Sequence, residues 1–420
     1  MFIFDLGVFP MTDPMVTRLR ALCAVPVAAV HAFVLAAVFL FVFMVSPPSA
    51  RAAEPVLIGL DADMSSAASE SGIAIKRGIE VAIEEINAAG GVLGRPLKLV
   101  VRDHRGNPAR GKDNIEEFAD MRNLVAVVGG IHTPVAMAEL DMIHKNKILY
   151  LGAWAAGTPV VDNGFDPNYV FRVSVRDQYA ARFLLEAALK RGYKKPGLLL
   201  ERTGWGRSSE KAFIEAAVGR GADIAGVQWL NWGAKDLNPQ IGALAQAGAD
   251  VIMLVTNPSE GVIAVKNIAA KPAEKRLPII SHWGITGGAF VKRVGSDIAD
   301  INLSFLQTVS FMDPPRPEKA AAFLDRYFKM YPDVKTAEDI RSPVGTAHAY
   351  DLVHMLARAI AKAGTIDRSA VRDAMENLGR YDGLVRAYDP PFTAARHDAL
   401  DVTDFSLARF RPDGAIVPTQ

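Results

Sequence analysis

The stretch A-I-E-E-I-N-A-A-G-G-V-L-G-R-P-L-K-L, residues 82–99, decides the fold of this chain. It begins inside a predicted helix, residues 71–88, in which isoleucines recur at three- and four-residue steps and form one apolar face. Gly90-Gly91 ends this helix, because glycine tolerates the left-handed backbone that closes a helix. The apolar runs 56–60 and 97–101 on either side predict buried strands. A helix between two such strands indicates a βαβ unit with parallel strands.

Outward from this unit, strands and helices continue to alternate in two series. Further strands are predicted at residues 125–128, 148–151, 197–200, 224–230, 251–255 and 278–280, and further helices at residues 109–121, 134–145, 178–190, 208–219, 240–246 and 260–269. Three helical stretches then follow, residues 317–330, 342–363 and 368–378, before two strand-like runs, residues 383–387 and 405–410. This order predicts an α/β fold with two mostly parallel sheets, one for each series.

The first 53 residues have the features of a targeting segment and not of a folded domain. Two arginines precede a long apolar run, residues 21–45, and small residues follow it. This order is that of a secretory signal peptide, residues 1–53, cleaved after Ala52 or Ala53. The apolar run is also long enough to span a bilayer, so an uncleaved membrane anchor stays open as the alternative.

Composition and motifs argue against several classes of protein. The net charge is +1 and there is no basic stripe, which argues against a nucleic-acid partner. The only cysteine, Cys23, lies in the apolar N-terminal run, so the body has no disulfide and no thiol nucleophile. The sequence has no Walker-A loop, no Gly-x-Ser-x-Gly motif and no histidine pair at metal-ligand spacing. We therefore expect no enzymatic activity, no metal and no cofactor.

A set of short motifs recurs in an order that resembles one known family. The motifs are residues 86–97 (I-N-A-A-G-G-V-L-G-R-P-L), Asp103 with Pro108, residues 125–129 (V-A-V-V-G), residues 191–193 (R-G-Y), residues 349–351 (A-Y-D), residues 381–383 (Y-D-G) and Asp413-Gly414. Each motif is weak by itself, but the ordered set is specific and extends from about residue 56 to residue 417. It resembles the branched-chain amino acid (Leu/Ile/Val) binding proteins of ABC importers.

The resemblance implies a type I periplasmic binding fold, in which two Rossmann-like lobes are joined by a three-segment hinge. Lobe 1 would comprise residues 54–173 plus 309–385, and lobe 2 would comprise residues 174–308 plus 386–420. The three crossings would lie near Ser174, Thr308 and Arg386. Such a hinge lets two lobes close around a solute.

Ligands of parallel α/β sheets bind at the carboxyl ends of the strands, so the loops after the strands should form the site. In the first lobe, the resemblance implies that Thr133 holds a ligand carboxylate, helped by the N–H groups of a helix start. His132 beside it is a further candidate, with a purely structural histidine as the alternative. Ser65, in the loop after the first strand, either offers its hydroxyl to a ligand or caps a turn.

The next loop of the first lobe, residues 152–158, is rich in small residues. By resemblance, Ala155 and Ala156 fit a backbone cradle for the same carboxylate. Trp154 between them and the strand stands out, because an aromatic side chain in such a loop often walls a pocket. The alternative is a tryptophan that packs into the lobe.

The second lobe contributes Trp205, which the resemblance implies stacks on the ligand, and Asn257, where relatives often have an aromatic residue. His282 and Trp283 stand where amino-acid binders typically carry an acid that pairs with the ligand ammonium. A buried ammonium needs an opposing charge or strong acceptors, and no nearby acid clearly fills that role. The three tryptophans and two histidines then suit a flat aromatic carboxylate as well as an amino acid.

These observations predict the extracytoplasmic substrate-binding protein of an ABC importer, a monomer exported to the periplasm. Its solute would be a small carboxylate: a branched-chain or other amino acid, or an aromatic acid. Its partners would be the permease subunits, and it would meet the membrane only through them or through an uncleaved N-terminal segment. The alternative from another class is a membrane-anchored ligand-sensing domain of a signalling system, which would keep the same fold.

Overall fold

A computed structural model describes residues 53–419 of the chain. Residues 1–52, which hold nearly all of the expected signal peptide, lie outside the described residues, as does residue 420. Residues Glu54–Gln420 form one compact unit. In that described part, no helix combines the length and the apolarity that a membrane crossing requires.

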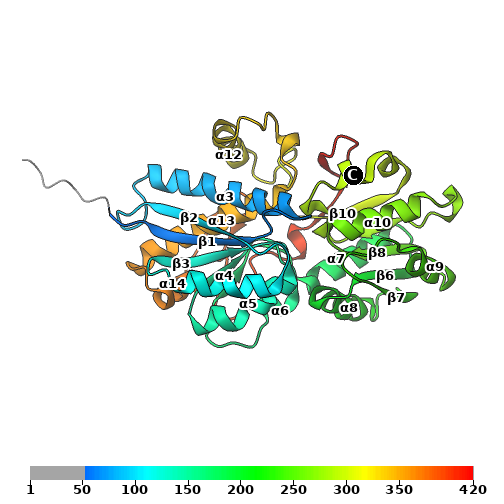
Figure 1. Cartoon of the computed structure of the whole chain (residues 1–420), viewed down its shortest axis with the longest axis horizontal. Helices are drawn as coiled ribbons and strands as arrows, with labels where there is room; N and C mark the ends of the chain where they lie inside the picture. Colours follow the sequence, from blue (N-terminus) through cyan, green and yellow to red (C-terminus); the bar gives the residue numbers. More distant parts are fainter. Residues whose placement is uncertain (1–52, 420) are drawn as a thin grey trace, which may run out of the picture. The chain divides into compact units, whose positions relative to one another are not determined.

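The first sheet has five parallel strands in the order β2-β1-β3-β4-β5. The strands are β1 (Val56–Ala62), β2 (Leu97–Asp103), β3 (Leu124–Gly129), β4 (Leu149–Gly152) and β5 (Val170–Arg172), and the helices between them are α3 (Ser69–Ala88), α4 (Pro108–Ala119), α5 (Thr133–Lys145) and α6 (Thr158–Val161). Figure 1 shows α3 on one side of this sheet and α4 and α5 on the other. Because helices cover both faces, every residue of β3 is buried.

The second sheet has seven strands in the order β14-β13-β10-β9-β8-β6-β7. Five are parallel, namely β6 (Pro196–Glu201), β7 (Gly226–Leu230), β8 (Val251–Val255), β9 (Ile279–Ser281) and β10 (Leu303–Gln307), while β13 (Ser406–Phe410) and β14 (Ile416–Pro418) run antiparallel at one edge. The connecting helices are α7 (Asp177–Lys190), α8 (Gly204–Ala217), α9 (Asn238–Gln246), α10 (Pro258–Ala269), α11 (Phe290–Val294) and the 3-10 turns η1 (Ala273–Lys275), η2 (Trp283–Gly287) and η3 (Gly295–Asp300). The α/β alternation in two sheets, predicted from the sequence, is confirmed.

The segment after β10 returns to the first sheet. It comprises α12 (Pro317–Met330), η4 (Ala337–Asp339), α13 (Pro343–Ala363), α14 (Arg368–Glu376), β11 (Tyr381–Asp382), β12 (Ala387–Tyr388) and η5 (Val402–Asp404), and α13 packs along α3. Beyond β12, the chain still lies against β5: Arg172 N donates to His397 O at 2.8 Å, and the rings of Phe171 and Phe392 lie 5.1 Å apart. Only then does it enter the second sheet as β13.

One predicted strand, residues 383–387, is wrong. The structure has a turn there, between β11 and β12, in which Gly383 N donates to Arg386 O at 2.9 Å. The cause is a buried carboxylate: Asp351 of α13 accepts hydrogen bonds from Leu384 N at 2.6 Å and Val385 N at 3.0 Å. These N–H groups therefore bind a side chain and not a neighbouring strand. The sequence pattern also missed β5, β10 and β14, which have only three to five residues each.

Two carboxyl groups are buried together beneath the loop that follows β3. Asp61, at the end of β1, and Glu139, on α5, are each 1% exposed, and Tyr150 lies beside them. Burial raises the pKa of Asp61 to about 6. Burial and the neighbouring Asp61 raise the pKa of Glu139 well above its usual range. The pair is therefore most stable when it holds a proton.

This pair makes a prediction for stability against pH. Unfolded carboxyls titrate near pH 4, so between about pH 4 and 6 the folded chain keeps a proton that the unfolded chain has lost. The free energy of unfolding should therefore fall as pH rises through this window, by roughly 2 kcal/mol. Glu139→Gln should flatten this slope and raise stability at about pH 8. Urea unfolding over this pH range measures both effects.

The control for this prediction is Glu116→Gln, an exposed glutamate of α4 in the same lobe, which should leave the slope unchanged. A wild-type profile that is flat, or that rises with pH, would contradict the shared-proton interpretation. So would a Glu139→Gln variant that keeps the wild-type slope.

Candidate functional site

Loops that follow the strands of the two sheets meet one another. In the loop after β3, Ile131 lies against Gly287 of η2, which follows β9 in the other sheet. Nearby, Thr158 N at the start of α6 donates to Ser208 Oγ of α8 at 3.0 Å. Because parallel α/β sheets bind ligands at the carboxyl ends of their strands, this junction is the candidate site.

Thr133 is the first residue of α5 and ties two loops of the first sheet together. Its side chain is 1% exposed, and its Oγ1 accepts a hydrogen bond from Gly157 N at 3.2 Å. Pro134 fits the first turn of α5, where a missing N–H costs nothing. The hydroxyl of Thr133 therefore lies at a helix start, the kind of position that attracts a carboxylate.

The backbone carbonyl groups of residues 154–157 all accept hydrogen bonds from the end of β5 and the segment that follows it. Arg172, which is fully buried, donates from Nη1 to Ala155 O at 3.1 Å and to Gly157 O at 2.8 Å. The Ser174 hydroxyl donates to Trp154 O at 2.7 Å, and Asp177 N donates to Ala156 O at 2.9 Å. Asp398 holds the guanidinium, 2.6 Å from Nε. With these carbonyl oxygens already bonded, the free polar group that this loop most clearly offers to a solute is a donor.

Trp154 is one such donor. It is fully buried, and its ring lies 5.9 Å from that of Trp283 in the other sheet. Its Nε1 has no hydrogen-bond partner within residues 53–419. Behind both rings, His348 of α13 bonds Ala153 O through Nδ1 and the Thr308 hydroxyl through Nε2, each at 2.9 Å. Burial lowers the pKa of His348 to about 4, so this ring is neutral.

On the second-sheet side, Trp205 and His282 converge on a buried acid, Asp177. Trp205 Nε1 donates to Asp177 Oδ1 at 3.1 Å, and His282 Nε2 lies 3.4 Å from the same oxygen. His282 Nδ1 accepts from Trp283 N at 2.9 Å, which leaves Nε2 as the ring's protonated nitrogen in the neutral form. Gly284 is needed here, because a Cβ would lie 2.5 Å from the Trp205 ring.

Asp177 is the acid that the sequence analysis did not find. It is the first residue of α7, is 1% exposed, and its Oδ2 has no hydrogen-bond partner in the described part of the chain. Asp177 follows β5, a strand of only three residues that no apolar run in the sequence predicts. Its position also fits an ordinary acid in a first helical turn, which hides any other role. The sequence did offer one signal: Asp177 is an acid three residues after Ser174, where the first hinge crossing is expected.

The structure divides the predicted site residues into groups. Seven of them meet at the junction that contains Asp177: Thr133, Trp154, Ala155, Ala156, Trp205, His282 and Trp283. Two others, His132 and Asn257, belong to a second group. Asn257 donates from N and Nδ2 to the buried Glu201, at 2.6 and 3.3 Å, while the ring of His132 faces Trp232.

Ser65 bonds neither group directly. It is exposed, and its hydroxyl donates to Asp103 Oδ2 at 2.5 Å. It does not cap α3, whose N-cap residue is Ala68. Asp63 orders this turn instead, by accepting from Ser66 N at 2.8 Å and Ala68 N at 3.2 Å.

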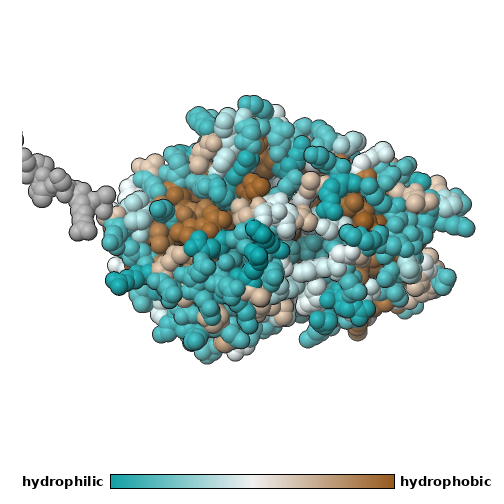
Figure 2. Space-filling view, viewed as in Figure 1, coloured by the Kyte–Doolittle hydropathy of each residue, from teal (hydrophilic) through white to brown (hydrophobic). Residues whose placement is uncertain are grey.

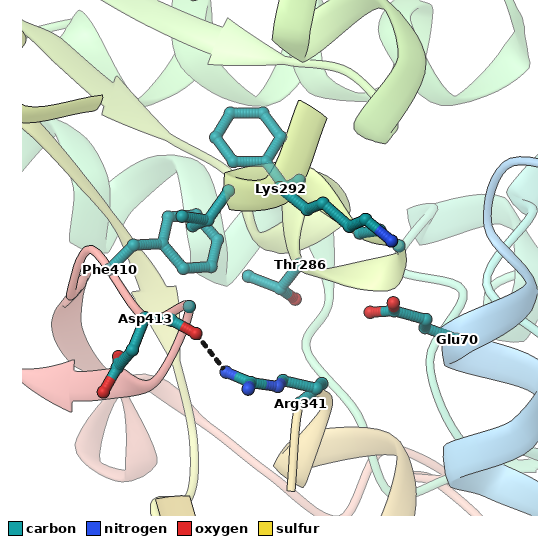
Figure 3. Close-up of a pocket in the computed structure, with 11 residues that line it drawn as sticks. Glu70, Thr286, Lys292, Arg341, Phe410 and Asp413 are labelled. Atoms are coloured by element: carbon teal, nitrogen blue, oxygen red, sulfur yellow. Dashed lines mark hydrogen bonds between the residues drawn. The ribbon is translucent and has the colours of Figure 1, made fainter. Parts of the chain in front are cut away.

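A cavity of about 240 Å³ adjoins the junction at η2. Figure 3 shows Glu70 of α3, Lys292 of α11 and Arg341 around it, with Thr286 and Phe410 on its walls. Arg341 Nη1 donates to the backbone oxygen of Asp413 at 2.7 Å, so elements of both sheets line this cavity. Thr286 Oγ1 donates to Trp283 O at 2.7 Å, which links the cavity wall to the tryptophan of the site.

Comparison with known proteins shows which family and which fold this chain shares. The chain is 25% identical over 318 residues to "Leu/Ile/Val-binding protein homolog 3" of Brucella melitensis, covering 75% of this chain and 81% of that protein. Two solved structures share its fold. LivJ of Streptococcus pneumoniae, in complex with isoleucine, has a TM-score of 0.71 and 20% identity, covering 87% of this chain and all of that one. A solute-binding protein of R. palustris, in complex with 4-hydroxybenzoate, has a TM-score of 0.70 and 18% identity, covering 87% and 96%.

The fold of the described residues is thus the type I periplasmic binding fold expected from the sequence motifs. The relatives are substrate-binding proteins of ABC transporters and members of the Leu/Ile/Val-binding group. A family model described as "Periplasmic binding protein" matches residues 55–415, nearly all of the chain beyond its N-terminal segment. This chain therefore belongs to the periplasmic binding protein family.

Proposed function

We propose that this protein captures a small carboxylate-containing solute between its two lobes and delivers it to the permease of an ABC importer. The observation that carries the proposal is a set of buried polar atoms without hydrogen bonds in the described residues, from loops and helix starts beside both sheets: Nε1 of Trp154, Oδ2 of Asp177 and Nε2 of His282, which comes no closer than 3.4 Å to Asp177 Oδ1. Buried polar groups are nearly always hydrogen-bonded. Donors and an acceptor left free at one junction therefore favour a polar ligand there.

The solute that suits this arrangement best is an amino acid. Thr133, at the start of α5, and the indole of Trp154 would meet its carboxylate. Asp177 would meet its ammonium through Oδ2, which is buried and has no hydrogen-bond partner among the described residues. A buried charge without a partner is costly, and a cationic ligand group would remove that cost.

An aromatic acid is the second candidate. The three tryptophans Trp154, Trp205 and Trp283 favour it, since each is at most 4% exposed and could flank a flat ring. The complex of the R. palustris relative with 4-hydroxybenzoate supports the same candidate.

The wider functional setting follows from the family. The lobes would be residues 54–173 plus 309–385 and residues 174–308 plus 386–420, hinged near Ser174, Thr308 and Arg386. The mature protein would be a periplasmic monomer, freed from a signal peptide at residues 1–53. It would act by binding and not by catalysis, and its macromolecular partners would be the permease subunits.

Thermal unfolding with L-leucine, L-isoleucine, L-valine, L-phenylalanine and 4-hydroxybenzoate tests the proposal. A ligand at about 100 times its Kd should add about 2.7 kcal/mol to stability, a readily measured rise in Tm. Glucose is the control, since it lacks a carboxylate and should have no effect. Stabilisation by none of the five carboxylates would contradict the proposed function.

A further inference from the structure

Trp232 is an exposed aromatic residue held in a fixed position. It is 41% exposed, one of the few large apolar side chains at the surface of the described residues. Figure 2 shows a face of the molecule that is mostly hydrophilic, with separate hydrophobic areas. Trp232 lies in a tight turn after β7, closed by a 3.1 Å hydrogen bond from Ala234 N to Asn231 O. Gly233 follows it with a φ of 80°, a backbone angle that favours glycine and fixes the turn type.

Two buried glutamates fasten this turn from below. Trp232 Nε1 donates to Glu201 Oε2 at 2.7 Å, and Gly233 N donates to Glu260 Oε1 at 2.8 Å. Glu201 is fully buried at the end of β6, and it also accepts from Thr256 Oγ1 at 3.1 Å and from the backbone N–H of Asn257 at 2.6 Å. These hydrogen bonds hold an exposed indole in one orientation, which favours a role for it in a contact.

The contact is with the other sheet. The ring of Trp232 meets that of His132, the residue before α5, edge-on with centroids 5.9 Å apart. His132 is 8% exposed, and Nδ1 has no hydrogen-bond partner among residues 53–419. Its ring also meets that of His104 at 5.5 Å and lies against Gly106. His132 directly precedes Thr133, so Trp232 covers the loop that would hold the solute carboxylate.

We propose that Trp232 is a closure residue: anchored by Glu201, it seats against His132 when the two lobes come together and so sets how tightly the captured solute is held. This inference rests on the proposed function, because it assumes lobes that open and close. The contact is built from one side chain of each sheet, so it forms only when the lobes meet. Its loss should speed solute release more than it slows capture.

The same contact should make solute binding depend on pH. Burial lowers the pKa of His132 to about 4, and the nearby Asp63 opposes this shift. Burial, and next the neighbouring His132, lower the pKa of His104 to about 3. The titratable groups that face the His132 ring are thus His104 and Asp63 from its own sheet. Glu201 lies behind Trp232, on the other side of the contact. Burial raises the pKa of Glu201 to about 7. The seated His132 must be neutral, so a proton on it opposes closure.

Titration calorimetry and stopped-flow measurement of solute release test the proposal. The probe is L-leucine, or whichever of the five carboxylates binds the wild-type protein. Trp232→Ala should weaken binding about tenfold, the worth of one aromatic contact. Trp232→Phe should recover only part of the loss, because phenylalanine keeps an aromatic ring but has no Nε1 to bond Glu201. Phe165→Ala is the matched control, because Phe165 also contacts a histidine ring, that of His144, but within one lobe. That variant should keep wild-type affinity.

The pH arm separates a contact role from a merely structural one. An exposed histidine titrates near pH 6.5, so wild-type affinity should fall roughly tenfold from about pH 7.5 to about pH 5.5. His132→Asn should flatten this dependence, since asparagine carries no proton. Equal Kd and release rates in wild type and Trp232→Ala would overturn the proposal, as would a pH profile that His132→Asn leaves unchanged.

A solute-free arm keeps this test distinct from that of the proposed function. In a Cys23→Ser background, which removes the only cysteine, Thr158→Cys with Ser208→Cys marks another contact between the lobes. Disulfide formation between these positions should be slower when Trp232→Ala is added, and unchanged when Phe165→Ala is added. If no carboxylate binds the wild-type protein, the proposed function fails, while this rate still decides whether Trp232 favours closure. An unchanged rate in Trp232→Ala would overturn the inference.

Discussion

Asp177→Asn should weaken the binding of an amino acid by about 100-fold, because removing one partner of a buried charge pair costs roughly 2–5 kcal/mol and each 1.4 kcal/mol is tenfold. Asparagine keeps an oxygen for Trp205 Nε1, which donates to Asp177 Oδ1 at 3.1 Å. The local structure should therefore survive, and Tm without solute should not fall. Titration calorimetry with L-leucine or another binding amino acid measures the loss.

A deaminated analogue sharpens this prediction. 4-Methylpentanoate has the carbon skeleton of leucine without the ammonium, so it cannot pair with Asp177. It should bind the wild-type protein far more weakly than leucine, and Asp177→Asn should reduce or reverse that preference. Asp162→Asn is the control, since Asp162 also carries an ion pair, to Arg176, but its side chain is 66% exposed. It should leave affinity unchanged.

The outcome distinguishes the two solute classes. If the wild-type protein prefers 4-hydroxybenzoate, and Asp177→Asn leaves that binding intact or improves it, the aromatic acid is the solute and Asp177 is no ammonium partner. If Asp177→Asn also lowers the Tm of the solute-free protein clearly, Asp177 has a structural role at the start of α7. Only a loss confined to ammonium-bearing solutes supports the proposed recognition.

Arg172→Met should cost about 3–5 kcal/mol of unfolding free energy, the expected result of breaking a buried ion pair from one side. The guanidinium of Arg172 is fully buried, and its Nε lies 2.6 Å from Asp398 Oδ1. Methionine would leave Asp398 with only Arg176, at 3.4 Å. It would also leave the carbonyl oxygen of Ala155 without its donor, and that of Gly157 with Val160 N alone. Urea unfolding at neutral pH measures the change.

The matched control for this prediction is Arg182→Met. Arg182 pairs with Glu186 at 2.9 Å, but these side chains are 53% and 39% exposed. Exposed pairs contribute about 0–1 kcal/mol, so the control should change stability little. The double variant Arg172→Met with Asp398→Leu should lose less than the two single losses added together, because it leaves no unpaired charge. A loss under about 1 kcal/mol for Arg172→Met would contradict the structural role given to this pair.

Arg172 also shows how stability and binding are connected in this fold. Its Nη1 orients the loop after β4 by two carbonyl hydrogen bonds, and its Nε fixes the chain near residue 398. The same side chain therefore shapes a loop of the candidate site and joins the C-terminal segment to the first sheet. We expect variants at this position to lower solute affinity as well as Tm.

The sequence by itself determined the order of strands and helices, since that order follows from local patterns. Isoleucines at helical spacing before Gly90 and apolar runs such as β3 need no information from distant residues. Most residues of the candidate site could be predicted for the same reason: Thr133, Trp154 and Trp205 all follow a strand, where parallel sheets bind ligands. Local pattern failed at residues 383–387, where the distant Asp351 decides which N–H groups bond.

Only the tertiary structure decided which of these side chains work together. Asp177, at a helix start, has the pattern of an ordinary first-turn acid, and it becomes a candidate for ammonium recognition because Trp205 and His282 fold onto it from distant segments. Trp232 follows a strand like many loop residues, and its partner His132 lies 100 positions earlier in the other sheet. Burial and pairing depend on contacts between residues far apart in the chain. A single sequence lists such groups but does not state their distances.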